Sequence, residues 1–253
     1  MNLAPLNYNF GNASNYSFAT TITCNNEDAR KMFVEGFGHM LNYNHEQAIA
    51  CYMNVTELDP TCAMAWWGIA YCVSSNYNWT PGLGSGYDPI QQAISLKAGC
   101  TALEQDLIDA LAERHSEEAR DAADPSVLNM GNSPELNIAF AKAMAPLYLK
   151  YKGNLDVAAI YVEALMNLNA WQLWNKNTET GEITPLDNNT LLCVKVMEDA
   201  FENIDDAKEH GALCHLYGHC LELSPFPERA LPAADLLRTA MPSMGHLVHM
   251  PSH

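Results

Sequence analysis

The chain has 253 residues, of which 48% are hydrophobic, and a formal net charge of -17 with only 13 Lys and Arg side chains. The length and composition are typical of a folded protein with a sizeable core. The shortage of cations argues against a nucleic-acid partner and against docking on an anionic membrane surface, because both need clustered Lys and Arg side chains.

The apolar runs and the cysteines bear on the compartment. No run of 18 apolar residues occurs, so we expect no membrane-spanning helix, and the first residues lack the basic and apolar stretches of a signal peptide. The eight cysteines form no Cys-x-x-Cys pair, and several lie within apolar helical patterns. We therefore expect reduced, buried thiols and a cytoplasmic or other intracellular compartment.

Helical periodicity runs through most of the chain. Residues 1–26 are predicted to form an extended N-terminal segment, and residues 27–253 a helical domain in which Gly and Pro separate the helices. The predicted helices span residues 27–42, 45–58, 62–75, 102–116, 134–151, 154–168, 187–203, 209–223 and 227–241. Irregular insertions are expected near residues 79–89, 121–133 and 175–187. The predicted fold class is all-α.

Small residues and prolines recur in a pattern that indicates a repeat. A tetratricopeptide repeat is 34 residues long, with a small residue at position 8, Ala at 20, an aromatic residue at 24 and Pro at 32. Counted from residue 29, these positions hold Gly36, Ala48, Tyr52 and Pro60; counted from residue 211, positions 8, 20 and 32 hold Gly218, Ala230 and Pro242. Because small residues are needed where two helices cross closely, the pattern favours a tetratricopeptide-like α-solenoid of antiparallel helix pairs with irregular insertions.

Several short motifs carry a family resemblance. They are Tyr43-Asn-His-Glu-Gln-Ala48, Asp59-Pro-Thr-Cys-Ala-Met-Ala-Trp-Trp-Gly68, Glu163-Ala-Leu-Met166 with Trp171-Gln-Leu-Trp174, His215-Leu-Tyr-Gly-His219 with Glu222, and Gly245-His-Leu-Val-His-Met-Pro-Ser-His253. With them the chain resembles the large tetratricopeptide-repeat proteins of bacteria and some eukaryotes. The resemblance implies the fold more than an activity. It also implies that more chain follows, and the repeat that begins at Gly245 is unfinished, so we expect an incomplete C-terminal repeat.

Five of the nine histidines lie between residues 215 and 253. His215 and His219 are four residues apart, which places them on one face of a helix, and Glu222 joins that face. His249 and His253 repeat the same spacing 34 residues later. Both pairs therefore fall at the same positions of consecutive repeats, whose first helices are expected to pack about 8–10 Å apart.

These four imidazoles and the Glu222 carboxylate predict a metal site in the concave groove. The ligand types suit a transition-metal ion such as copper, iron or zinc. His246 is a further candidate ligand, and Glu163 is another that only the resemblance singles out. Pro251 interrupts the second histidine pair and weakens the argument that its two rings share one face. A hydrogen-bonded polar cluster inherited through repeat duplication is the alternative.

Aromatic residues are expected to line the rest of the groove. Phe33, Phe37, Trp67, Tyr71 and Trp171 are predicted to contact a small-molecule or peptide ligand there, with core packing as the alternative. The first functional hypothesis is a metal-dependent enzyme, with redox or oxygen chemistry slightly favoured over hydrolysis. The second is a non-catalytic protein-interaction scaffold whose histidines form a structural cluster.

Overall fold

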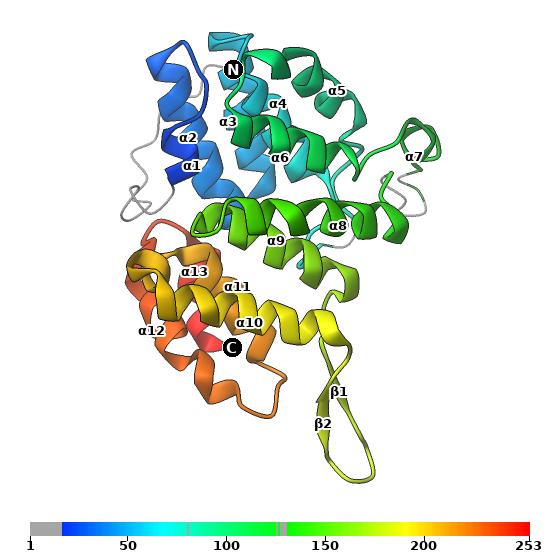
Figure 1. Ribbon diagram of the computed structural model, residues 1–253, viewed down its shortest axis with the longest axis vertical. Helices are drawn as coiled ribbons and strands as arrows, with labels where there is room; N and C mark the ends of the chain where they lie inside the picture. The colour runs from blue at the N-terminus through cyan, green and yellow to red at the C-terminus, as the bar shows by residue number, and fades with distance from the viewer. Residues whose placement is uncertain (1–16, 80, 125, 127–130) are drawn as a thin grey trace.

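The computed structural model describes residues 17–79, 81–124, 126 and 131–253, and over these ranges the protein is all-α, as predicted (Figure 1). The helices are α1 (Ser17–Thr20), α2 (Glu27–Leu41), α3 (His45–Leu58), α4 (Ala63–Val73), α5 (Tyr87–Leu96), α6 (Ala102–Ala112), α7 (Glu117–Asp121), α8 (Pro134–Lys150), α9 (Leu155–Met166), α10 (Asn188–Asn203), α11 (Gly211–Leu221), α12 (Leu231–Ala240) and α13 (Gly245–His249). One hairpin, β1 (Trp174–Lys176) with β2 (Ile183–Pro185), is the sheet within these ranges.

Side-chain caps explain where several helices begin. The Asn26 side chain accepts hydrogen bonds from the backbone N–H groups of Asp28 and Ala29 at the start of α2. Thr101 and Glu104 form a capping box at the start of α6. Because a cap satisfies N–H groups that have no partner within the helix, these residues fix the first turn. Seven predicted helices, from residue 27 to residue 203, correspond closely to α2, α3, α4, α6, α8, α9 and α10.

The structure differs from the predicted elements in the insertions and near the N-terminus. Helix α5 begins inside the first expected insertion, and the third contains the antiparallel β1–β2 hairpin, which pairs Asn175 with Thr184. The predicted helix over 227–241 is divided into a 3₁₀ turn at Pro227–Ala230 and α12, whose second residue is a proline. Part of the segment expected to be extended forms α1, while residues 1–16 and much of the second insertion lie outside the described residues.

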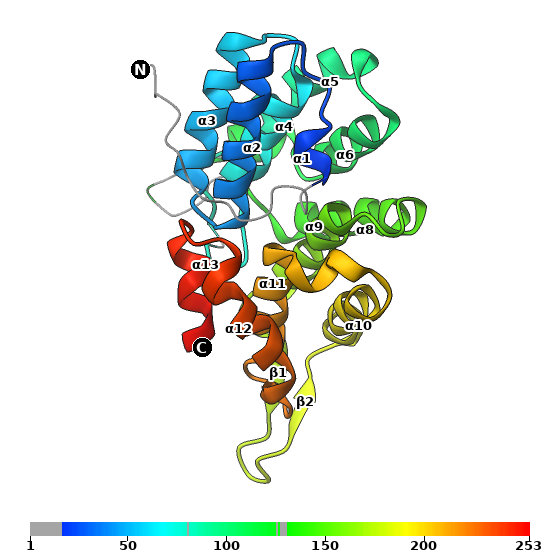
Figure 2. The same ribbon diagram turned by 90° about the vertical axis from the view of Figure 1, so that its left-hand side faces the viewer.

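Close helix crossings in the first half depend on glycine. Helix α3 packs against both α2 and α4, as Figure 2 shows. A Cβ atom added to Gly36 would lie 2.9 Å from the Tyr52 ring, and one added to Gly68 would lie 2.5 Å from the same ring. The fully buried Tyr52 side chain therefore fills a space that only glycine leaves open on both flanking helices. At Gly218, by contrast, the nearest neighbour of an added Cβ would be Met250 at 3.6 Å.

The aromatic residues of the first helices belong to the core, which corrects the prediction that they line a groove. Phe33, Phe37, Trp67 and Tyr71 are all at most 4% exposed. The Trp67 indole N–H donates to the Leu107 carbonyl oxygen at 3.1 Å. Because α4 is covered by α3, α5 and α6, its rings face neighbouring helices on several sides and have no open groove to line.

The last helix returns to the first helix pair. Helix α13 lies against the α2–α3 end of the molecule in both views of the ribbon (Figures 1 and 2). The Leu247 backbone N–H donates to Asn42 Oδ1 at 3.3 Å, which ties α13 to the residue after α2. The C-terminal histidines thus lie beside residues from the first third of the chain.

The cysteines are reduced and mostly buried, as expected from the sequence. All eight cysteines are free thiols, and all are buried except the half-buried Cys100. Burial raises the pKa of Cys214 and of Cys220 to about 12, so both remain protonated thiols. Among the described helices, none combines the length and the apolar character needed to cross a membrane.

Candidate metal centre

Helix α11 supplies the first two histidines of the site. It is covered by α9, α10 and α12, so His215 and His219 are 0% and 2% exposed. Their ring centroids lie 4.8 Å apart, as expected for residues four apart on one helical face. His210 begins the helix by accepting a hydrogen bond from the Leu213 backbone N–H. The site is therefore built on a buried and well-anchored helix.

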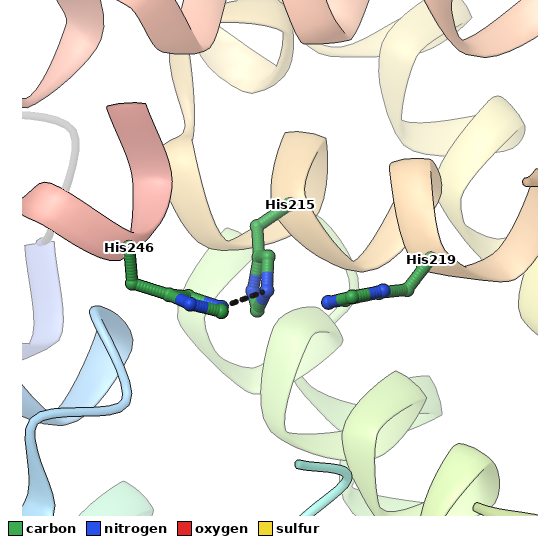
Figure 3. Close-up of side chains that lie close together, drawn as sticks. All are labelled: His215, His219 and His246. Carbon is green, nitrogen blue, oxygen red and sulfur yellow. Dashed lines mark hydrogen bonds between the residues drawn. The ribbon is translucent and has the colours of Figure 1, made fainter. Parts of the chain in front are cut away.

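The third histidine is His246, at the start of α13. Its Nε2 lies 3.0 Å from His215 Nε2, and one ligand nitrogen from each of His215, His219 and His246 lies within 4.8 Å of the other two. Figure 3 shows the His215 ring between the other two rings. We call these three residues the histidine triad.

The predicted ligands fall into two adjoining groups. His246, the additional candidate, joins His215 and His219, while His253 forms a separate group of possible ligands with His219 and Glu222; His249 is in neither group. Helix α13 ends at His249 and continues as a 3₁₀ turn containing Pro251. The His249 and His253 rings nevertheless lie 5.1 Å apart at 78°, close to the 4.8 Å and 72° of the first pair.

Glu222 connects the triad to the outer pair of histidines. Its Oε1 lies 3.0 Å from His219 Nδ1, and its Oε2 lies 2.6 Å from His253 Nδ1. His253 Nε2 in turn lies 3.2 Å from His249 Nε2. Glu222 therefore occupies the position of an orienting carboxylate beside His219, an arrangement that is typical of metal-binding histidines.

Burial and the neighbouring imidazoles lower the pKa values of His215 and His246 and keep both rings neutral. Burial, followed by the neighbouring His219, lowers the pKa of His246 to about 4 and that of His215 well below its ordinary value. The pKa of Glu222 is also lowered: burial opposes ionisation, but the hydrogen bonds from His219 and His253 outweigh it. Neutral imidazoles beside an ionised carboxylate are the state that metal binding requires.

The nitrogen atoms of the triad fit a metal ion chemically. Because ionised Glu222 only accepts hydrogen bonds, His219 carries its proton on Nδ1 and leaves a lone pair on Nε2. That Nε2 and His215 Nδ1 are both buried without a hydrogen-bond partner. An ion would satisfy donor atoms that are otherwise costly to bury.

Strained backbone supports the triad from two sides. Among the described residues, two non-glycine residues have positive φ, Tyr43 at 59° and Trp171 at 64°. The Tyr43 ring centroid lies 4.8 Å from that of His215, and the Trp171 centroid lies 5.3 Å from that of His219. Strain of this kind persists where the surrounding structure holds it, often at functional sites. Of the predicted groove aromatics, Trp171 alone contacts a histidine of the triad.

Glu163 takes a different place from the one predicted. It is buried on α9, where its Oε2 accepts a hydrogen bond from the Tyr71 hydroxyl at 2.6 Å. Burial raises the pKa of Tyr43, and the nearby Glu163 charge raises it further, so Glu163 lies close to Tyr43. Glu163 is not grouped with the histidines and instead belongs to the polar surroundings of the tyrosine that packs on them.

A surface pocket opens beside His246. It has a volume of about 510 Å³, within the range of small-molecule sites. Its lining residues are His39, Asn42, Tyr43, Asn44, Asn78, Ser243, Met244, Gly245 and His246. Asn78 Nδ2 lies 3.1 Å from His246 Nε2, so one wall of the pocket contacts the triad. The sequence pattern did not identify the asparagines, because they come from loops that only the tertiary fold brings together.

A further group of candidate ligands lies between α2 and α3. One ligand atom from each of Glu35, His39 and Cys51 lies within 4.8 Å of the others. Burial raises the pKa of Cys51 to about 12, so its sulfur is a neutral thiol rather than the thiolate that binds metals. The histidine triad is therefore the better candidate.

The chain was compared with family models, curated proteins and solved structures, and no match was found in any of the three.

Proposed function

We propose that this protein is a metal-dependent enzyme that holds a transition-metal ion with His215, His219 and His246. The observation that carries the proposal is the pair of buried nitrogen atoms without a partner, His215 Nδ1 and His219 Nε2, within a group of three clustered imidazoles. A purely structural cluster would be expected to satisfy such atoms with hydrogen bonds.

Two features favour catalysis over simple metal storage. Three protein ligands leave a coordination position open, as in catalytic metal sites. The pocket beside His246 offers a small molecule a route to that position. When bound, the metal would supply either electron transfer and oxygen activation or polarisation of a bound water. We favour redox or oxygen chemistry, because both oxygens of Glu222 are engaged by imidazoles and are not free to act as a general base.

We further propose that the scaffold is a tetratricopeptide-like α-solenoid. The proposal is supported by the crossing at Gly36 and Tyr52, which fall at the positions where that repeat requires a small residue and an aromatic residue. Gly68 and Tyr52 make a second close approach on the next helix.

A non-catalytic interaction scaffold with a structural histidine cluster is the second candidate. One observation favours it. A continuous chain of polar contacts already runs from His219 through Glu222 and His253 to His249, made by ring nitrogens and carboxylate oxygens. Such a network can stabilise a fold without any ion.

Metal analysis of the purified, untagged protein separates the two candidates. We expect near-stoichiometric copper, iron or zinc in the wild type, and loss of the buried ion in the His215→Ala/His246→Ala double variant. Val248→Ala, at an exposed position of the same α13 helix, is the matched control and should retain the metal. A wild-type protein that contains no metal and takes up none at micromolar concentration would leave the scaffold as the better explanation.

A further inference from the structure

His249 and His253 form a pair of their own on the solvent side of the triad. Their Nε2 atoms lie 3.2 Å apart, and both residues are exposed. Each ring is held through its other nitrogen: His253 Nδ1 lies 2.6 Å from Glu222 Oε2, and His249 Nδ1 lies 3.2 Å from Ser252 Oγ. Metal-binding histidines are commonly anchored in this way by an oxygen behind the ring.

Counting hydrogens shows where the lone pairs of this pair lie. The Ser252 hydroxyl donates its single hydrogen to the His249 carbonyl oxygen at 2.7 Å, so Ser252 Oγ must accept from His249 Nδ1–H. Ionised Glu222 has no hydrogen to donate, so His253 also carries its proton on Nδ1. Both Nε2 atoms are therefore left with lone pairs.

Two lone pairs at this separation repel each other unless a cation lies between them. The 3.2 Å distance falls within the range of about 2.9–3.4 Å expected for two nitrogens bound to one ion. The 3₁₀ turn at Met250–Ser252 brings the two rings side by side, with centroids 5.1 Å apart.

We propose that His249 and His253 bind a second metal ion through their Nε2 atoms. The ligand class is a divalent ion with an affinity for imidazole, such as Cu²⁺, Zn²⁺ or Ni²⁺, with water in the remaining positions. We call this pair the outer site. It has two protein ligands against the three of the triad, so it binds its ion more weakly.

Glu222 links the outer site to the triad, and this link, unlike the outer ion itself, rests on the proposed function. One carboxylate oxygen orients His219 and the other orients His253. Movement of the carboxylate toward one imidazole alters the hydrogen bond to the other. Occupancy of one site is therefore expected to change the affinity of the other.

Equilibrium dialysis of the full chain against Cu²⁺ tests the outer site. We expect two ions in the wild type and in Val248→Ala, and one ion in His249→Ala/His253→Ala and in His215→Ala/His246→Ala. In the last variant, electron paramagnetic resonance should show Cu²⁺ bound by two nitrogens. Ser252→Ala, which removes the acceptor behind His249, should weaken the outer site by about 10-fold with no change in the fold.

The remaining outcomes are distinct. A single ion in the wild type that is lost only in the triad variant would overturn the outer site, with a shared proton then holding the two rings together, and would leave the proposed function intact. A single ion lost only in the outer-site variant would support the outer site and contradict the proposed function. Two ions retained after removal of both outer histidines would also overturn the outer site. Circular dichroism confirms that each variant is folded.

Discussion

The ring of Tyr43 packs edge-on against the ring of His215, with centroids 4.8 Å apart and planes at 73°. Tyr43 lies in the short connection between α2 and α3, whereas His215 belongs to α11. The contact therefore joins the first helix pair to the helix that carries the candidate metal ligands. It also fixes the orientation of an imidazole that has an unsatisfied Nδ1 atom.

Replacing Tyr43 should loosen the triad. We expect Tyr43→Ala to reduce metal affinity by about 10-fold, because the ring no longer supports His215 and His246, and to lower the free energy of unfolding by about 1–3 kcal/mol. Tyr43→Phe keeps the ring and should bind metal like the wild type. Metal titration and urea unfolding measure the two effects, and equal losses in both variants would show that the hydroxyl group matters rather than the ring.

Replacing Glu222 should affect both groups of histidines. In Glu222→Gln only one side-chain oxygen can accept a hydrogen bond, so either His219 or His253 loses its acceptor. We expect metal affinity to fall by about 10- to 100-fold. Glu228→Gln makes the same substitution at an exposed position six residues further along the chain, and it is the control. Unchanged affinity in isothermal titration of Glu222→Gln would mean that the carboxylate does not orient the ligands.

Acid should destabilise the protein through His115, which lies outside the metal site. Burial, followed by the charge of Arg114, lowers the pKa of His115 from 6.5 to about 3. Below pH 6.5 the unfolded chain takes up a proton that the folded protein does not, so stability falls as the pH falls from about 6.5 to 3. For such a group, each pH unit in this window lowers the free energy of unfolding by about 1.4 kcal/mol.

The variant His115→Gln removes this titration. We expect the free energy of unfolding to depend less steeply on pH between about 6 and 4 than in the wild type. Urea unfolding of the metal-free protein at several pH values gives the slope. Parallel slopes for the two proteins would show that His115 is accessible to protons in the folded state.

The glycine crossings predict opposite effects at two positions. A Cβ at residue 68 would lie 2.5 Å from the fully buried Tyr52 ring, so Gly68→Ala should destabilise the protein by about 1–3 kcal/mol. At Gly218 the nearest atom is 3.6 Å away, so Gly218→Ala should be tolerated and gain up to about 1 kcal/mol from helix propensity. Chemical denaturation of both variants decides the point, and a stable Gly68→Ala protein would contradict the tight crossing.

Sequence periodicity was sufficient for the helices because their signals are local. Apolar spacing and the Gly and Pro residues between helices are read within a few residues, so α2 through α4 were predicted almost to the residue. The face shared by His215 and His219 follows from helix geometry alone. The β1–β2 hairpin was missed because its strands are three residues long, too short for an alternating pattern to appear.

The membership of the site depended on contacts between distant parts of the chain. Local spacing identified two pairs of histidines, but it could not show that α13 is short and ends in a 3₁₀ turn, which brings His246 rather than His249 to His215. Nor could it place Tyr43 against the triad, since that contact exists only because the last helix packs back onto the first helix pair. Helix formation and the common face of two histidines are set by neighbouring residues, whereas the ligand set and its support are set by how complete helices pack.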